Sequence, residues 1–301
     1  TSCAGGATIS SRFALEKEAV SGTGLRIAID GLKGGHSGME IHKGRANANI
    51  LLFRILSAIQ EKTALRMVSL SGGSRDNVIP SQARADIWVE RAESAHLAIE
   101  EMVQVLQAEF QTSDPGLSVS VESVQLDEAY TQDLTKRLLC FFSLLPNGVQ
   151  ALSPDIEGLV QTSLNNAVLF EKEGYLVLQT SLRSSKSSQL EELADQLKQL
   201  VEAASGSYLR QNDYPSWDFE ADSPLREQCL AVYKEVYGRQ ARYDAVHAGL
   251  ECGFLKKTLP ECDMISYGPN IYDVHSTKEH LEIDSVARVW AFTKALLASM
   301  R

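Results

Sequence analysis

The chain has 301 residues, of which 44% are hydrophobic and 23% are charged, as is typical of a globular protein with a substantial core. Its net charge of -10 argues against nucleic acid as a partner, because phosphate binding needs a basic face. No apolar stretch is long enough to span a bilayer, so we expect no membrane partner. Five scattered cysteines indicate neither a disulfide framework nor a thiolate zinc site, which favours a cytoplasmic protein.

Residues 25–125 alternate between strand-like and helix-like patterns. Apolar runs bounded by turn residues predict strands, and apolar positions repeating at three and four residues predict helices. The predicted elements are a strand at 25–29, a helix at 44–61, strands at 65–70 and 83–89, a helix from Ser94, and a strand at 117–121. This βαββαβ order is that of a ferredoxin-like sandwich.

Residues 131–210 predict a second unit of the same kind. Its expected elements are a helix at 131–145, a hairpin of strands at 159–170 and 175–182, a helix at 188–204, and a short strand at 207–210. The two units share no residue-level repeat, so the likeness between them is architectural.

The pattern changes again near residue 211. An amphipathic helix at 224–237 is followed by a strand at 264–267 and a closing helix at 285–300. This alternation is typical of the C-terminal part of an α/β domain, so the fold class we expect for the whole chain is α/β.

Two histidines lie in segments that indicate chemistry. His36 has glycines on both sides in Gly34-Gly35-His36-Ser37-Gly38, a loop that can bring backbone close to a ligand. His275 follows the apolar run 264–267 in another loop, a common place for a metal ligand or a catalytic group. Taken alone, either histidine is more often a surface or hydrogen-bonded residue.

The sequence around these histidines resembles that of the aminoacyl-histidine (Xaa-His, carnosine-type) dipeptidases. These enzymes belong to the dinuclear-zinc peptidase family that also holds aminoacylases and carboxypeptidases. The likeness recurs in order along the chain at Asn47-Ala48-Asn49, Asn77-Val78-Ile79-Pro80, Pro146-Asn147-Gly148-Val149, Thr162-Ser163-Leu164-Asn165, Leu182-Arg183-Ser184 and His247-Ala248-Gly249-Leu250-Glu251-Cys252-Gly253.

The resemblance implies a partial zinc-peptidase catalytic domain with an inserted α+β lid of two ferredoxin-like halves. Residues 1–22 would be the edge of a first catalytic segment, 23–210 the lid or dimerisation domain, and 211–301 a second catalytic segment. The halves of the lid would lie at about 25–125 and 131–210. We also expect that the start of the chain corresponds to the middle of the relatives, so that most of the catalytic domain is missing.

The resemblance assigns substrate roles to three residues. His36 would donate a hydrogen bond to the oxyanion of the tetrahedral intermediate. Arg183 would bind the free carboxylate of the substrate, for which a planar bidentate donor is well suited. Asn77 would bind the substrate carbonyl or terminus. The alternatives are a turn histidine, a solvent-exposed arginine and an Asx-turn residue, respectively.

The metal site is expected to be incomplete. By resemblance the intact enzyme holds two zinc ions, and manganese or cobalt would also suit oxygen and imidazole ligands. His275 and Glu16 are the metal ligands expected here, although Glu16 could instead belong to a charged surface run. The His-x-Asp motif, the bridging aspartate and the Glu-Glu pair of the family have no counterpart near the start of this chain. We therefore predict that the 301-residue chain alone is inactive.

The function implied is hydrolysis of Xaa-His dipeptides by zinc-activated water. Glutamate at position 16 favours an alternative within the same chemistry, an N-acyl amino acid hydrolase or carboxypeptidase. An alternative of another class is a non-catalytic lid or dimerisation remnant. A dipeptide is the expected substrate. A homodimer through exposed lid strands stays open beside a monomer whose double lid completes the site.

Overall fold

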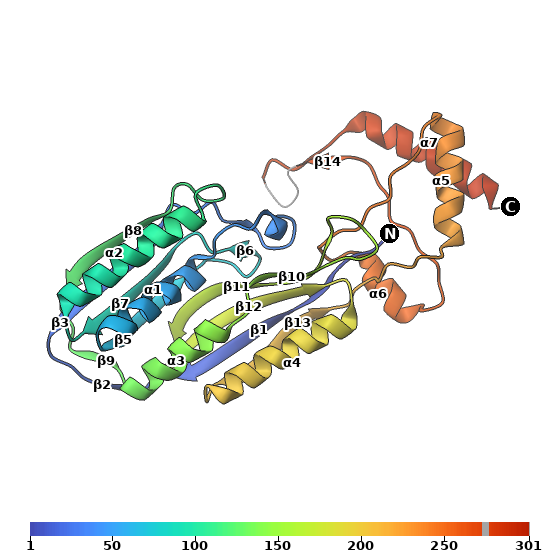
Figure 1. Ribbon diagram of the computed structural model, residues 1–301. Helices are drawn as coiled ribbons and strands as arrows, with labels where there is room; N and C mark the ends of the chain where they lie inside the picture. Colours follow the sequence, from blue (N-terminus) through green and yellow to red (C-terminus); the bar gives the residue numbers. More distant parts are fainter. Residues whose placement is uncertain (273–276, 301) are drawn as a thin grey trace.

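A computed structural model of the protein describes residues 1–272 and 277–300, and Figure 1 shows its two layers. One layer is a nine-stranded sheet, and the other consists of helices α1 to α4 on one face of that sheet. The remaining helices gather at one end, where the N-terminus also lies. In the described part of the chain, no helix is both long and apolar enough to cross a membrane.

The first half of the sheet has the predicted βαββαβ order. Its elements are β3 (Thr23–Asp30), α1 (Ala48–Lys62), β5 (Leu65–Gly72), β7 (Ala83–Val89), α2 (Ala92–Glu109) and β8 (Ser118–Val124). The strands lie in the antiparallel order β8-β3-β7-β5. The ferredoxin-like prediction is therefore confirmed for this half.

The second half has the same topology, but its first strand comes from the start of the chain. Its elements are β1 (Gly5–Ala14), α3 (Gln132–Leu144), β11 (Val160–Lys172), β12 (Tyr175–Ser184), α4 (Ser187–Ala203) and β13 (Ser207–Tyr214). The strand order is β13-β1-β12-β11, again antiparallel. The boundary expected at residue 22 thus falls after a strand that is central to the lid sheet, and the whole first half is inserted between β1 and α3.

The two halves join edge to edge. Strand β5 pairs with β11 at Gly72 and Leu169. Beside this contact lies a network of buried amides around Asn47, which caps α1 by accepting hydrogen bonds from the backbone of Asn49 and Ile50. The Asn47 Nδ2 atom donates to Asn165, Asn166 and Asn147, all in the second half. Buried polar groups stabilise such a junction where they are satisfied, as the Asn47 amide is, whereas the buried Asn49 Oδ1 has no partner among the described residues.

Apolar side chains between sheet and helices form one continuous core. The inner face of α1 contributes Leu52, Ile55 and Leu56, none of which is exposed to solvent. Phe53 of α1 stacks on Phe142 of α3, so the core also connects the helices of the two halves. Burying each large apolar side chain contributes about 1.5–3 kcal/mol, which makes this core the main source of stability.

Several short strands and one 3-10 helix lie outside the eight-strand path of the main sheet. They are β2 (Lys17–Ala19) paired with β9 (Glu128–Tyr130), β4 (Gly35–His36) paired with β6 (Val78–Ile79), β10 (Gly148–Leu152) on β11, and the 3-10 helix η1 (Ile41–Lys43).

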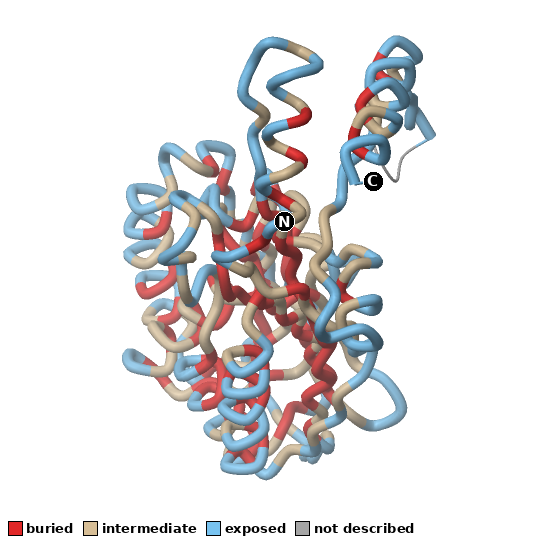
Figure 2. Tube along the Cα trace, turned by 90° about the vertical axis from the view of Figure 1, so that its right-hand side faces the viewer, coloured by how far each residue is buried: buried red, intermediate tan, exposed pale blue. Residues whose placement is uncertain are grey.

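The C-terminal region contains α5 (Pro224–Tyr237), α6 (Glu251–Thr258), β14 (Ile271–Tyr272), β15 (His280–Leu281) and α7 (Ile283–Ser299). A small core between α5 and α7 includes Cys229, Val232 and Phe292. The strand predicted at 264–267 is wrong, because these apolar residues form no strand and pair with none of the described strands. Figure 2 shows buried residues concentrated in the sheet and its helices, whereas the projecting C-terminal helices are largely exposed.

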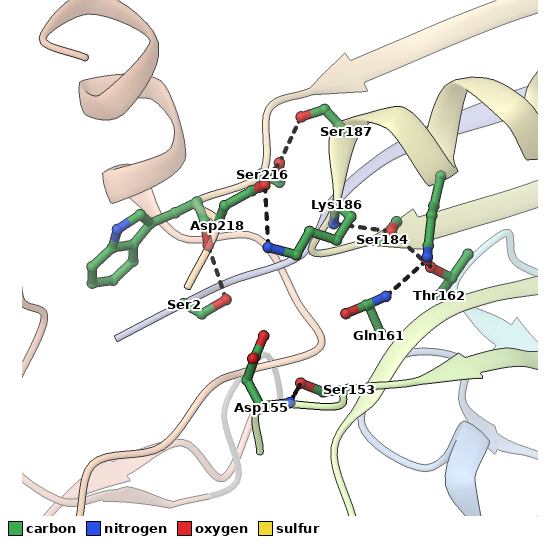
Figure 3. A network of polar contacts seen from close by, with 12 residues as sticks. Ser2, Ser153, Asp155, Gln161, Thr162, Ser184, Lys186, Ser187, Ser216 and Asp218 are labelled. Carbon is green, nitrogen blue, oxygen red and sulfur yellow. Dashed lines mark hydrogen bonds and ion pairs between the residues drawn. The ribbon is translucent and has the colours of Figure 1, made fainter. Parts of the chain in front are cut away.

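Polar contacts attach the C-terminal region to the second half (Figure 3). The hydroxyls of Ser216 and Ser187 are 2.9 Å apart, and Asp218 forms an ion pair with Lys186 at 3.8 Å. Ser2 donates to the carbonyl of Trp217 at 2.9 Å. The start of α4, the start of the chain and residues 216–218 are therefore tied together just beyond β13.

Candidate functional site

The His36 loop belongs to the first half but is held against the second. Strand β4 places His36 opposite Val78 of β6. The carbonyl of Val78 accepts a hydrogen bond from Asn165 Nδ2 of β11 at 2.8 Å. The Asn77 carbonyl accepts from the Ser37 amide at 2.9 Å, so Asn77 supports this loop through its backbone while its side chain is exposed.

The His36 ring has a defined tautomer. Its Nδ1 accepts hydrogen bonds from the backbone amides of Gly38 at 3.1 Å and Met39 at 3.0 Å. A ring nitrogen that accepts from two amides carries no proton, so in the neutral ring the proton lies on Nε2. His36 therefore presents an N–H donor from Nε2, which is the form that oxyanion stabilisation requires.

Glu40 fixes the backbone of the same loop. Its Oε2 accepts from the His36 amide at 3.0 Å, and its Oε1 contacts Lys43 at 2.7 Å and Arg45 at 3.1 Å. Hydrogen bonds from Lys43 and from the His36 amide lower the pKa of Glu40 to about 2. The carboxylate is consequently ionised near neutral pH, where it can hold the loop.

Arg183 is a partly buried cation. It lies on β12 in a row with Ser163 of β11, Gly6 of β1 and Tyr214 of β13, which are register partners. Its Nη1 donates to the Tyr214 hydroxyl at 2.9 Å. Within residues 1–272 and 277–300, its buried Nε has no acceptor and no carboxylate pairs with it. A buried donor left in this way favours an anionic ligand.

His247 is buried beside Arg183. The Val246 amide donates to the carbonyl of Ser2 and the Val246 carbonyl accepts from the amide of Ala4, which holds its loop next to the start of β1. Its Nε2 lies 2.7 Å from the Ser163 hydroxyl. Burial and the charge of Arg183 lower the pKa of His247 to about 4, so the ring is neutral at physiological pH.

Gly38 marks the point where these groups converge. A Cβ atom at Gly38 would lie 2.6 Å from the His247 carbonyl, 3.2 Å from Arg183 Nε and 3.2 Å from His36 Cε1. The structure thus brings together His36 and Arg183, which the sequence singled out, with His247, to which sequence reasoning gave no direct role. The motif His247-Ala248-Gly249 was the available signal, but its partner Ser163 is distant in the chain.

Glu16 is not part of this cluster. It follows β1, whose ten residues extend roughly 30 Å at about 3.3 Å per residue, whereas Gly6 and Arg183 lie near the other end. Its carboxylate forms an ion pair with Arg137 at 3.0 Å. This position conflicts with the expectation of a metal ligand at Glu16, and we leave it out of the proposed site.

The metal expectation does not fit the described residues. No three His, Cys, Asp or Glu side chains gather there in a way that could hold an ion. His275, the other expected ligand, lies outside the described residues.

Comparisons with known proteins show which proteins this chain is similar to. Residues 27–115 match the family model described as a peptidase dimerisation domain. The chain is 34% identical to the cytosol non-specific dipeptidase of Escherichia coli K12 over 303 residues, which cover 98% of this chain and 62% of that protein. It is also similar to the crystal structure of aminoacylhistidine dipeptidase from Vibrio alginolyticus, with a TM-score of 0.93 and 31% identity over 99% of this chain and 62% of that one.

The chain therefore spans about 62% of the length of these two relatives. The two alignments cover 98% and 99% of this chain. The chain therefore contains a peptidase dimerisation domain of the M20 type, and over nearly its whole length it is similar to part of these two dipeptidases.

Proposed function

We propose that this chain supplies the substrate-binding lid of a cytoplasmic metal-dependent dipeptidase that hydrolyses Xaa-His dipeptides. The observation that supports the proposal is that His36, whose Nδ1 accepts two amide hydrogen bonds, and Arg183, which pairs with no carboxylate among the described residues, both lie close to Gly38. A dipeptide offers a matching pair of groups. Its scissile carbonyl becomes an oxyanion during hydrolysis, and its free C-terminus is a carboxylate.

In this proposal Arg183 binds the terminal carboxylate through its Nε edge. His36 Nε2 donates to the carbonyl oxygen as negative charge develops there, a contact that is stronger in the transition state than in the ground state. In the same proposal the exposed side chain of Asn77, on the loop that supports His36, binds the substrate carbonyl or terminus. These residues bind and orient; none of them activates water.

Water activation is proposed for a metal site that is completed by residues other than the described ones. Zinc is the metal we propose, as two ions, and manganese or cobalt are alternatives. Because the described residues offer no group of three ligands, we expect the 301-residue chain alone to be inactive.

The domain boundaries are proposed in revised form. We assign β1 to the lid together with residues 23–210, and residues 211–301 to a catalytic segment. The C-terminal segment exposes several large apolar side chains on or next to α6, β14 and α7. They are Phe254, Leu259, Ile271, Ile283, Trp290 and Leu297. A homodimer is proposed through the lid, in line with the matched dimerisation domain.

The test compares substrates with and without the terminal carboxylate. The native protein that contains this chain, loaded with zinc, is assayed on β-alanyl-histidine, on its C-terminal amide and on an N-acetyl amino acid. We expect the dipeptide to be preferred, and Arg183→Met to raise the KM for the dipeptide by about 10- to 100-fold, because hydrogen bonds to charged groups contribute roughly 1.5–3 kcal/mol. The KM for the amide should change little.

Preference for the N-acetyl amino acid would replace the dipeptidase proposal with the acyl-hydrolase alternative. Absence of hydrolysis of all three substrates would favour the non-catalytic lid. Equal effects of Arg183→Met on the dipeptide and its amide would remove Arg183 from carboxylate binding.

A further inference from the structure

Tyr214 contacts Arg183 across an intervening strand. Tyr214 ends β13, Arg183 lies on β12, and β1 runs between these two strands. The residue of β1 in register with both is Gly6. The phenol oxygen nevertheless accepts a hydrogen bond from Arg183 Nη1 at 2.9 Å, so the tyrosine reaches over β1.

Two glycines from separate segments make room for the tyrosine ring. A Cβ at Gly6 would lie 2.5 Å from the Tyr214 hydroxyl oxygen and 2.6 Å from Cζ, distances that real Cβ atoms do not show. A Cβ at Gly249 would lie 3.0 Å from Cε2 of the same ring. The ring therefore occupies a slot between β1 and the His247 loop, and any side chain at Gly6 would displace it.

Tyr214 orients Arg183 without neutralising it. Burial raises the pKa of Tyr214 above its ordinary value, so the phenol keeps its proton at physiological pH. The arginines that stabilise the surface of the lid have carboxylate partners instead, as in Arg137 with Glu16 and Arg210 with Glu191. A neutral acceptor fixes the position of a guanidinium and leaves its positive charge for another anion.

The geometry also determines which edge of the Arg183 guanidinium remains for binding a carboxylate. Tyr214 holds Nη1, whereas the buried Nε has no acceptor in the described part of the chain and lies 3.2 Å from where a Cβ on Gly38 would be. The edge formed by Nε and Nη2 is one of the two edges that bind a carboxylate in a bidentate manner. We infer that Tyr214 is a positioning residue that presents this edge of Arg183 to the carboxylate of the substrate, with Gly6 and Gly249 forming its slot.

This inference rests on the proposed carboxylate-binding role of Arg183, so the experiment separates the two. The zinc-loaded native protein is assayed on β-alanyl-histidine and on its C-terminal amide as wild type, Tyr214→Phe, Arg183→Met and the double variant. Tyr214→Phe should raise the KM for the dipeptide about tenfold with kcat within twofold, because it loosens the contact with the carboxylate alone. The KM for the amide should not change.

The double variant provides the decisive comparison. Once Arg183 is replaced, Tyr214→Phe should not raise the KM for the dipeptide further, because Tyr214 acts only by positioning Arg183. Tyr208→Phe is the matched control, since Tyr208 lies on the same strand, in register with Ser11, and has no hydrogen bond from its hydroxyl to a described residue. Gly6→Ala should reproduce the KM effect by displacing the ring.

The positioning role would be overturned if Tyr214→Phe raised the KM for the dipeptide and for its amide equally. It would also be overturned if Tyr214→Phe raised the KM as much in the Arg183→Met background as in the wild type. Either result would leave carboxylate binding by Arg183 intact. If Arg183→Met itself fails to distinguish the dipeptide from the amide, both the proposed role of Arg183 and the inference built on it are wrong.

Discussion

At the residue scale, the site depends on keeping an arginine charged beside a histidine that is neutral. Arg183 and buried His247 lie close enough for the arginine charge to disfavour imidazolium, and burial acts in the same direction. Ser163 supplies the partner for the ring at Nε2. His247 therefore adds no positive charge beside Arg183, the group that we propose binds the anionic substrate.

This arrangement predicts a pH dependence of stability. The pKa of His247 falls from 6.5 to about 4 on folding, so the unfolded chain binds more protons between these values. The stabilising contribution is present above pH 6.5 and is lost as pH falls toward 4, by roughly 3 kcal/mol at most. In urea unfolding measured between pH 4 and 7.5, the free energy of unfolding should fall less steeply with decreasing pH in His247→Gln than in the wild type.

His96→Gln, at an exposed position on α2, is the matched control for that measurement. It should retain the wild-type slope. Identical slopes in the wild type and in His247→Gln would show that His247 is not held neutral by the fold.

The sequence identified part of this site and missed the rest for a physical reason. His36 and Arg183 lie in recognisable motifs, and both converge on Gly38 in the structure. Tyr214 carries no such signal, because its importance comes from register partners in β12 and β1 that are far from it in the chain. Glu16, expected as a metal ligand from the family resemblance, pairs with Arg137 and follows the end of β1 that is distant from Gly6 and Arg183.

At the element scale, the junction between the halves rests on side-chain amides. Asn47 caps α1 and also donates to three groups of the second half, so one residue serves local and tertiary structure together. The βαββαβ pattern of the first half was predictable because all its elements are consecutive. The full second half was not, because β1 joins its sheet from before the inserted first half.

Asn47→Ala should therefore lower the free energy of unfolding by more than the loss of a helix cap alone does. Replacing a cap residue costs about 1 kcal/mol, and leaving buried acceptors unsatisfied adds about 1–3 kcal/mol. Thr131→Ala is the matched control, since Thr131 caps α3 through a single hydrogen bond to Leu134 and makes no contact with the asparagine network. Equal losses of unfolding free energy in both variants, measured in urea, would contradict a role of Asn47 in the junction.

At the scale of the whole molecule, two ferredoxin-like halves create a site that neither half contains alone. His36 comes from the first half, Arg183 and Tyr214 from the second, and His247 from the C-terminal region. The edge pairing of β5 with β11 and the contact between Asn165 and Val78 bring these segments to one place. The site is thus a product of tertiary assembly, which explains why no single segment of the sequence defines it.

The central claim is that His36 stabilises the oxyanion in the proposed reaction. The measurement that tests it most directly is steady-state hydrolysis of β-alanyl-histidine by the zinc-loaded native protein as wild type, His36→Ala and His42→Ala, the last being an exposed control on η1. Loss of one oxyanion donor lowers kcat by about 100- to 1000-fold, so we predict that decrease for His36→Ala, with KM within about threefold and His42→Ala unchanged. A His36→Ala variant with wild-type kcat would show that His36 does not stabilise the oxyanion.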